Sequence, residues 1–210
     1  DKLAAQVRYM EAHPDCALAV HAAAVKNDRG EFVNRNLMRP YRGDRNLSPE
    51  ELIDKAGSFP FGAMLFRREV VETLPDWYYR CPVGDRPLEL LAALHGYCHY
   101  ADRFDSVYRF HGAGSWTEEM KTGNFRKKQD EYAAAMRELY RDFDQQSGGK
   151  YRRAAVSAAR RVYFLTRVNL RDYAKIFSPR FRRYYLELSL RDRCLIRAER
   201  ALPFLFAGLR

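Results

Sequence analysis

A nearly continuous apolar run at residues 17–25 (ALAVHAAAV) constrains the fold more than any other feature of the sequence. A strand with apolar residues on both faces must be covered on both sides, as in sheets that pack between helices. A helical pattern precedes the run, because Leu3, Val7 and Met10 recur at helical spacing before Pro14. The sequence therefore predicts an α/β fold built around a buried strand.

A mixed α/β pattern continues through residues 1–118. Ser48 and Glu51 form a capping box around Pro49, which predicts the start of a short helix. The other predicted elements are a strand at 62–66, a helix at 88–94 that ends at His95-Gly96, and extended segments at 97–101 and 106–111 joined by a tight link at 102–105. No apolar stretch reaches the length of about 20 residues that crosses a bilayer.

Long helices follow, and we expect residues 119–210 to form a basic α-helical extension. The predicted helices span residues 118–145, 151–176 and 180–201. The charge is uneven: residues 121–210 carry 22 basic and 9 acidic side chains, whereas residues 1–120 carry 15 and 18. This asymmetry indicates an anionic partner for the helical part, either a membrane surface or a nucleic acid.

The helix predicted at 151–176 is strongly amphipathic. At about 100° per residue its arginines fall within a sector of about 100°, opposite an apolar stripe. These arginines are Arg152, Arg153, Arg160, Arg167 and Arg171. Three interpretations remain open: a surface helix that packs its apolar stripe on the domain, a helix held at an anionic membrane, or a nucleic-acid contact.

The four cysteines lie far apart in the sequence and include no C-x-x-C pair. Such spacing is typical neither of a disulfide framework nor of a zinc finger. We therefore expect a reducing, cytoplasmic setting in which the cysteines are small core residues.

Asp85 stands where a helix is predicted to begin, directly after Gly84. One interpretation is an N-cap that satisfies backbone N–H groups. The other is a general base, since a carboxylate presented at a helix start can face a cleft and accept a proton from a substrate hydroxyl.

A second candidate site lies at residues 106–116. On a strand, Arg109 and His111 share one face. A neutral imidazole is a common ligand of divalent metals, and an arginine suits phosphate. The alternative is an ordinary edge strand with solvated side chains, and Trp116 is open to interpretation as packing or as a platform for a sugar ring.

Four motifs, in order, resemble the C-terminal part of family 2 glycosyltransferases, which have the glycosyltransferase A-type fold. The first is Asp1-Lys2-Leu3 with Gln6-Val7 and Glu11, and the second is the FPFGAMLFRR segment at residues 59–68. The third is Gly84-Asp85 followed by Leu88, Leu90 and His95-Gly96, and the last is Tyr108-Arg109-Phe110-His111 with Gly114 and Trp116. The resemblance covers residues 1–118. Arg86 stands where the family usually has an aromatic residue, and the family's nucleotide-binding strands and Asp-x-Asp segment precede the matched region.

The resemblance implies an inverting transferase that uses a nucleotide sugar. It implies Asp85 as the catalytic base and His111 as a ligand of Mg²⁺ or Mn²⁺. The residues implied to bind substrate are Phe61, Gly62, Ala63, Gly84, Arg109 and Trp116.

The expected partners follow from this function. They are a nucleotide sugar, a glycan or lipid-linked acceptor, and an anionic membrane at whose inner face the protein is peripheral, whereas nucleic acid is not expected. Two alternatives remain: a non-catalytic basic helical module that binds nucleic acid or an anionic membrane, and a degenerate transferase-like scaffold.

Overall fold

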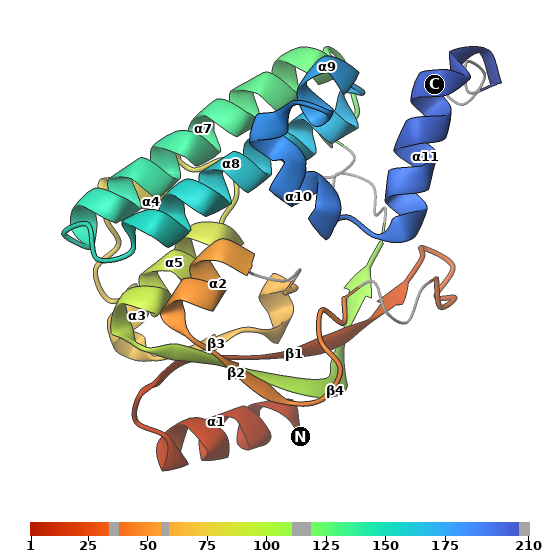
Figure 1. The fold of residues 1–210 in the computed structure, drawn as a ribbon. Helices are drawn as coiled ribbons and strands as arrows, with labels where there is room; N and C mark the ends of the chain where they lie inside the picture. The colour runs from red at the N-terminus through yellow and green to blue at the C-terminus, as the bar shows by residue number, and fades with distance from the viewer. Residues whose placement is uncertain (34–37, 56–58, 111–118, 206–210) are drawn as a thin grey trace.

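A four-stranded mixed sheet, in the order β2-β4-β1-β3, lies at the centre of the fold (Figure 1). The computed structural model describes residues 1–33, 38–55, 59–110 and 119–205. The long strands β1 (Cys16–Lys26) and β4 (Tyr97–Arg109) are parallel. The short strands β2 (Arg45–Leu47) and β3 (Leu65–Phe66) pair antiparallel with β4 and β1. The prediction of a mixed α/β fold is confirmed.

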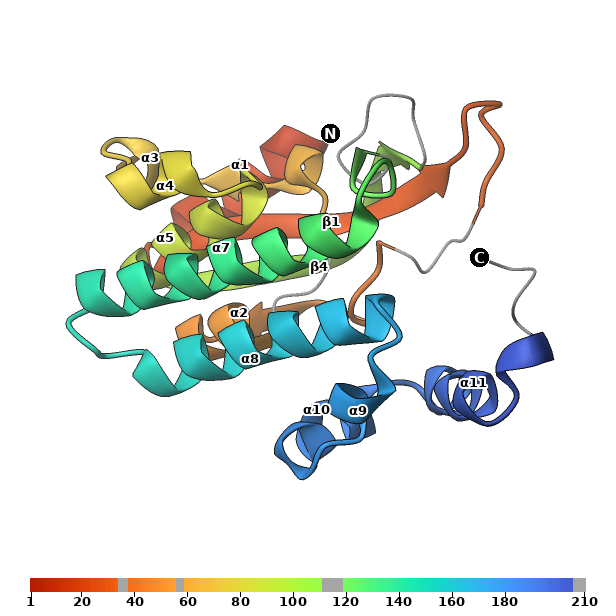
Figure 2. The ribbon, with the colours of Figure 1, turned by 90° about the horizontal axis from the view of Figure 1, so that it is seen from above.

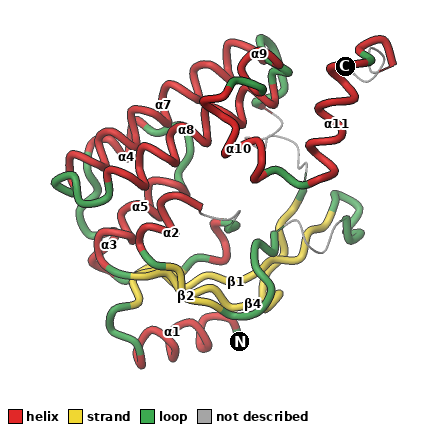
Figure 3. Tube along the Cα trace, viewed as in Figure 1, coloured by secondary structure: helices red, strands yellow, loops and turns green. Residues whose placement is uncertain are grey.

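The first eight residues of β1 are buried, because helices cover both faces of the sheet. α1 (Lys2–Ala12) lies on one face, where Met10 packs with Cys16 and Ala19. On the other face lie α2 (Pro49–Lys55) and α5 (Asp85–His95), with the short helices α3 (Arg68–Val71) and α4 (Asp76–Arg80) beside them. Figure 3 shows that most of the helices gather on this side. The prediction of a doubly buried strand is confirmed.

The structure confirms two local predictions, the capping box at Ser48 and the end of a helix at Gly96. Ser48 Oγ accepts from the Glu51 N–H at 3.2 Å, and the Glu51 carboxylate accepts from the Ser48 N–H at 3.0 Å, so the capping box is confirmed. α5 ends at Gly96, where a Cβ would lie 2.1 Å from the Asp15 carbonyl oxygen, so only glycine fits.

Two predicted extended regions differ in the structure. The segment at 62–66 begins as the 3₁₀ turn η1 (Phe61–Ala63) before β3. The segment at 97–101 and residues 106–109 belong to one strand, the expected link at 102–105 is an irregularity inside it, Phe110 is a turn, and His111 lies outside the described residues. His21 pairs with Ala101 and Ala23 with Ser106, so the extra residues of β4 bulge while the strands stay paired.

The helices after residue 119 begin with a long hairpin. α7 (Phe125–Gln146) and α8 (Arg152–Asn169) lie side by side (Figures 1 and 2). Met136 and Phe143 of α7 and Ala158 of α8 belong to the same core as Leu52 and Leu90. The hairpin therefore closes the main core of the sheet and its helices.

The two later predicted helices are interrupted. α8 ends at Asn169, and Arg171 adopts a positive φ of 54° before α9 (Tyr173–Ile176). The segment at 180–201 splits into η2 (Pro179–Phe181), α10 (Arg182–Glu187) and α11 (Leu190–Ala201). Ser189 caps α11 by accepting from the Asp192 N–H at 3.1 Å. A separate cluster of six buried residues holds these elements together: Phe164, Ile176, Phe181, Tyr184, Tyr185 and Ile196.

Among the described residues, none of the helices has the length and apolar character that a membrane crossing needs. All four cysteines are free of disulfide bonds. Cys16 and Cys98 are buried as predicted, whereas Cys81 is half-buried and Cys194 is exposed, so the core prediction is wrong for Cys194.

Candidate functional site

Asp85 is the first residue of α5, and its carboxylate is partly exposed. Gly84, not Asp85, occupies the N-cap position, so the N-cap interpretation of Asp85 is wrong. One carboxylate oxygen accepts from the Arg86 N–H at 2.8 Å, and Asp85 has no ion pair with any residue that the structure describes.

Gly84 is exposed beside this carboxylate. A Cβ built at Gly84 meets no described atom within 4 Å, and the φ of −91° is open to any residue. Neither the backbone nor the neighbouring chain therefore requires glycine at this position. Its small size leaves space next to Asp85.

The side chain of Arg86 turns inward and fixes the start of α5. Its Nε donates to the Tyr140 hydroxyl at 2.8 Å, and one terminal nitrogen donates to the Leu52 carbonyl at 2.9 Å and to the Glu89 carboxylate at 2.5 Å. The other terminal nitrogen donates to the Ile53 carbonyl. The guanidinium thus joins α2, α5 and α7 and anchors the residue that follows Asp85.

Arg86 and its partners are buried, and burial shifts the pKa values of titratable groups around them. Burial raises the pKa of Glu89 to about 7, although Arg86 opposes the shift. Burial also raises the pKa of the Cys81 thiol and of the Tyr132 hydroxyl, and the charge of Asp85 adds to each shift. Cys81 and Tyr132 are therefore the titratable neighbours of Asp85 on the α4 and α7 sides.

The predicted sugar-binding residues 61–63 form η1. Phe61 and Gly62 are exposed, whereas Ala63 is fully buried. Lys2 Nζ donates to the Gly62 carbonyl at 2.7 Å, and Gln6 Nε2 donates to the Ala63 carbonyl at 2.9 Å, so α1 holds the turn in place. No hydrogen bond, ion pair or ring contact among the described residues joins η1 to Asp85, which sits on a separate element.

Arg109 is exposed at the last position of β4, where it pairs with Lys26 of β1. His111 and Trp116 lie outside the described residues. Within the described part of the chain, no group of three or more His, Cys, Asp or Glu side chains is placed to hold a metal ion. The role of His111 as a ligand of Mg²⁺ or Mn²⁺ stays a prediction.

The sequence did not predict two polar features of the structure, the buried His21 and the ion pair of Arg39 with Asp102. His21 is buried in β1, with Nδ1 2.7 Å from the Ala22 carbonyl oxygen and Nε2 without a described partner; burial lowers its pKa. Arg39 donates two hydrogen bonds, at 2.6 and 2.5 Å, to Asp102, and these hold the pKa of that carboxyl down at about 2. The only sequence signal for His21 was a histidine inside an apolar run. Arg39 and Asp102 are 63 residues apart and gave no local signal.

The five arginines expected on one face of a long helix have different environments in the structure. Arg152, Arg153 and Arg160 are exposed on α8, but Arg167 is 5% exposed and pairs with Asp130. Arg171 lies beyond the end of α8 and pairs with Glu199 at 3.0 Å. The continuous arginine face is therefore wrong, because Arg167 pairs with Asp130 of α7 and α8 ends at Asn169, before Arg171.

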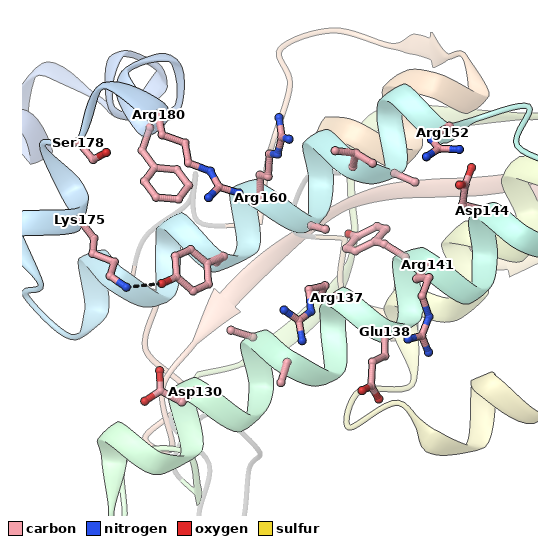
Figure 4. A pocket seen from close by; sticks show the side chains of 18 of the residues that line it. Asp130, Arg137, Glu138, Arg141, Asp144, Arg152, Arg160, Lys175, Ser178 and Arg180 are labelled. Atoms are coloured by element: carbon pink, nitrogen blue, oxygen red, sulfur yellow. Dashed lines mark hydrogen bonds between the residues drawn. The ribbon is translucent and has the colours of Figure 1, made fainter.

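A groove of about 1040 Å³ lies between α7, α8 and the α9–η2 segment (Figure 4). Six basic side chains line it: Arg137, Arg141, Arg152, Arg160, Lys175 and Arg180. Only three acidic side chains do so: Asp130, Glu138 and Asp144. The groove carries an excess of positive charge.

No protein-family model, no curated protein and no solved structure matches this chain. The likeness to family 2 glycosyltransferases therefore rests on the four sequence motifs alone.

Proposed function

We propose that this chain is the acceptor-side half of an inverting glycosyltransferase that moves a sugar from a nucleotide sugar to a glycan or lipid-linked acceptor. The observation that supports this best is the position and the exposure of Asp85. Its carboxylate is partly exposed and free of ion pairs among the described residues, at the start of a helix that Arg86 anchors to two other helices. A general base needs this combination of a fixed position and an available oxygen.

In the proposed reaction, Asp85 accepts the proton of an acceptor hydroxyl. The acceptor oxygen attacks the anomeric carbon from the face opposite the nucleotide, and the new glycosidic bond forms as the bond to the nucleoside diphosphate breaks. The proton stays on Asp85 until solvent removes it. The role of the chain in this step is to hold the carboxylate in place, which typically contributes a factor of about 10²–10⁴ in rate.

The other proposed roles rest on the sequence resemblance. Exposed Phe61 and Gly62, with Gly84 and Arg109, would contact the sugar and the acceptor. Ala63 would support that contact from below, because it is buried. Trp116, and His111 with Mg²⁺ or Mn²⁺, remain proposals on residues outside the described part of the chain. When bound, such an ion would offset the charge of the departing diphosphate.

The test is a sugar-transfer assay on the longest native polypeptide that contains this chain. Asp85→Asn should lower the transfer rate by about 10²-fold or more, because an amide cannot accept the proton. Asp76→Asn is the matched control, since Asp76 is also a carboxylate in the first turn of a helix and is exposed. Unchanged transfer by Asp85→Asn would contradict the proposal and favour a scaffold.

The end of the described chain favours a second function, contact with an anionic membrane at its inner face. Leu190, Leu202, Phe204 and Leu205 are 72%, 41%, 69% and 62% exposed. Exposed arginines stand among them on α11: Arg191, Arg197 and Arg200. Exposed apolar side chains mixed with basic ones are typical of segments that lie in the membrane interface.

Vesicle co-sedimentation tests this contact. We expect binding to vesicles that contain phosphatidylglycerol, and loss of that binding in Leu202→Ser/Phe204→Ser/Leu205→Ser. The matched control, Phe32→Ser/Phe104→Ser/Val107→Ser, removes exposed apolar side chains far from α11 in the sequence and should still bind. Equal binding to neutral phosphatidylcholine vesicles would contradict an electrostatic contact.

A further inference from the structure

The groove between α7 and α8 has a floor of small apolar side chains. Ala133 and Ala134 come from α7, and Ala155, Val156 and Ala159 from α8. One end is closed by the rings of Tyr163 and Phe181, which stack with their centroids 5.6 Å apart. Lys175 Nζ donates to the Tyr163 hydroxyl at 3.0 Å and so fixes this end (Figure 4). The result is an apolar trough with one defined wall.

Three arginines from three different elements line the trough near that wall. Figure 4 shows Arg137 pointing into the space between α7 and α8, and Arg180 reaching from η2 toward α8, where Arg160 lies. All three are exposed, and none has an ion pair with a residue in the described ranges. Of the acidic lining residues, Asp130 accepts from Arg167, and neither Glu138 nor Asp144 forms an ion pair with these arginines among the described residues. The three guanidinium groups are thus available to an external anion.

We propose that this groove binds the phosphate-bearing headgroup of an anionic lipid, with the first part of the lipid tail on the alanine floor. Arginine matches phosphate geometry with paired N–H groups. The alanine and valine side chains give a tail an apolar surface to bury. The proposal goes beyond sugar transfer and needs no step of it.

The floor favours a lipid over a nucleic acid. Sequence-tolerant binding of single strands relies on aromatic side chains on which the bases stack. The ring of Tyr163 is already covered by Phe181 and by the Arg167 guanidinium, 4.7 Å from its centroid. The other aromatic lining residues, Tyr140 and Phe181, are 4% and 5% exposed, and the remaining floor offers methyl groups, which suit a hydrocarbon chain.

The experiment is calorimetric titration of the full chain with monomeric dioctanoyl phosphatidic acid. The groove variant is Arg137→Gln/Arg160→Gln/Arg180→Gln, and we expect its affinity to fall about tenfold or more. The control variant is Arg126→Gln/Arg153→Gln/Arg182→Gln, which removes the same charge from exposed positions on α7, α8 and α10. The control should bind within about twofold of the wild type.

A second variant guards against misfolding of the triple substitution. Ala159→Glu places a carboxylate on the floor among the arginines and should also abolish binding, at an unchanged far-ultraviolet circular dichroism spectrum. Asp85→Asn should bind the lipid normally, so a failure of the lipid proposal and a failure of the transferase proposal give different results.

Several results would overturn the proposal. Equal loss in the groove and control variants would mean that only the overall charge matters. Equal affinity for inorganic phosphate would mean that the tail makes no contribution, and equal affinity for dioctanoylglycerol would mean that the arginines make none. Tighter binding of a short single-stranded DNA, lost in the groove variant, would identify the occupant as a nucleic acid.

Discussion

The helical region (residues 119–205) gathers exposed arginines along one groove, whereas the exposed arginines of the sheet region (residues 1–110), such as Arg8 and Arg109, do not line it. In the sheet region, Arg39 and Arg86 are held by buried or half-buried carboxylates and carbonyls. In the helical region, Arg161 and Arg167 are also held by ion pairs, although Asp130, the partner of Arg167, is itself exposed. Arg160 and the other arginines that line the groove are exposed. The basic excess of the sequence therefore combines structural arginines with arginines that are free to bind a ligand.

Because paired and exposed arginines occur together, the number of basic residues in a region does not locate a binding surface. Arg160 and Arg161 are adjacent, yet Arg161 donates to the Asp54 carbonyl at 3.1 Å and ties α8 to α2, while Arg160 lines the groove. A single step of about 100° around a helix separates the two roles. Only the contacts that form on folding distinguish a structural arginine from one that lines the groove.

The largest expected effect comes from removing a structural arginine of the sheet region. Arg86→Ala should lower the free energy of unfolding by about 3–5 kcal/mol, because it leaves Glu89 buried without its partner. Urea unfolding measures the change. Arg153→Gln, at an exposed position, should change it by no more than about 0.5 kcal/mol. Similar costs for the two variants would remove the distinction between the regions.

The next effect is the pH dependence that Glu89 imposes. Its pKa rises from 4.5 to about 7 on folding, so between these values the folded protein keeps a proton that the unfolded chain releases. Stability should therefore fall as the pH rises from about 4.5 to about 7. Glu89→Gln should flatten this part of the profile in denaturant titrations at several pH values. A slope that survives the substitution would assign it to another group.

The smallest of these effects lies at the capping box. Ser48→Ala removes the acceptor for the Glu51 N–H and should lower the free energy of unfolding by about 1 kcal/mol. Ser48→Gly should cost only a few tenths of that amount relative to an intact cap. Chemical denaturation of the two variants side by side separates the loss of the hydroxyl, which both share, from the backbone preference at the N-cap, in which they differ. Equal costs for the two variants would contradict the expected backbone contribution.

The elements that the sequence predicted correctly depend on neighbours in the chain. The apolar run of β1, the Ser48 capping box and the end of α5 at Gly96 are local signals, and each is confirmed. The place of Asp85 at the start of a helix was predicted for the same reason.

The elements that were missed depend on partners far away in the sequence. Arg86 donates a hydrogen bond to Tyr140, 54 residues later in the chain. β4 continues through its irregularity because β1 pairs with the strand both before and after it. The buried Arg167 pairs with Asp130 of α7, 37 residues earlier in the chain. No periodicity within one helix contains that information, so the sequence could predict an arginine-rich helix but not which arginines are exposed.

The most direct test of this account measures two properties of one variant, Asp85→Asn. We expect sugar transfer to fall by about 10²-fold or more while binding of monomeric dioctanoyl phosphatidic acid stays within about twofold of the wild type. Transfer at the wild-type rate would contradict the role of Asp85. Loss of both properties together would contradict the separation of a catalytic sheet region from a ligand-binding helical region.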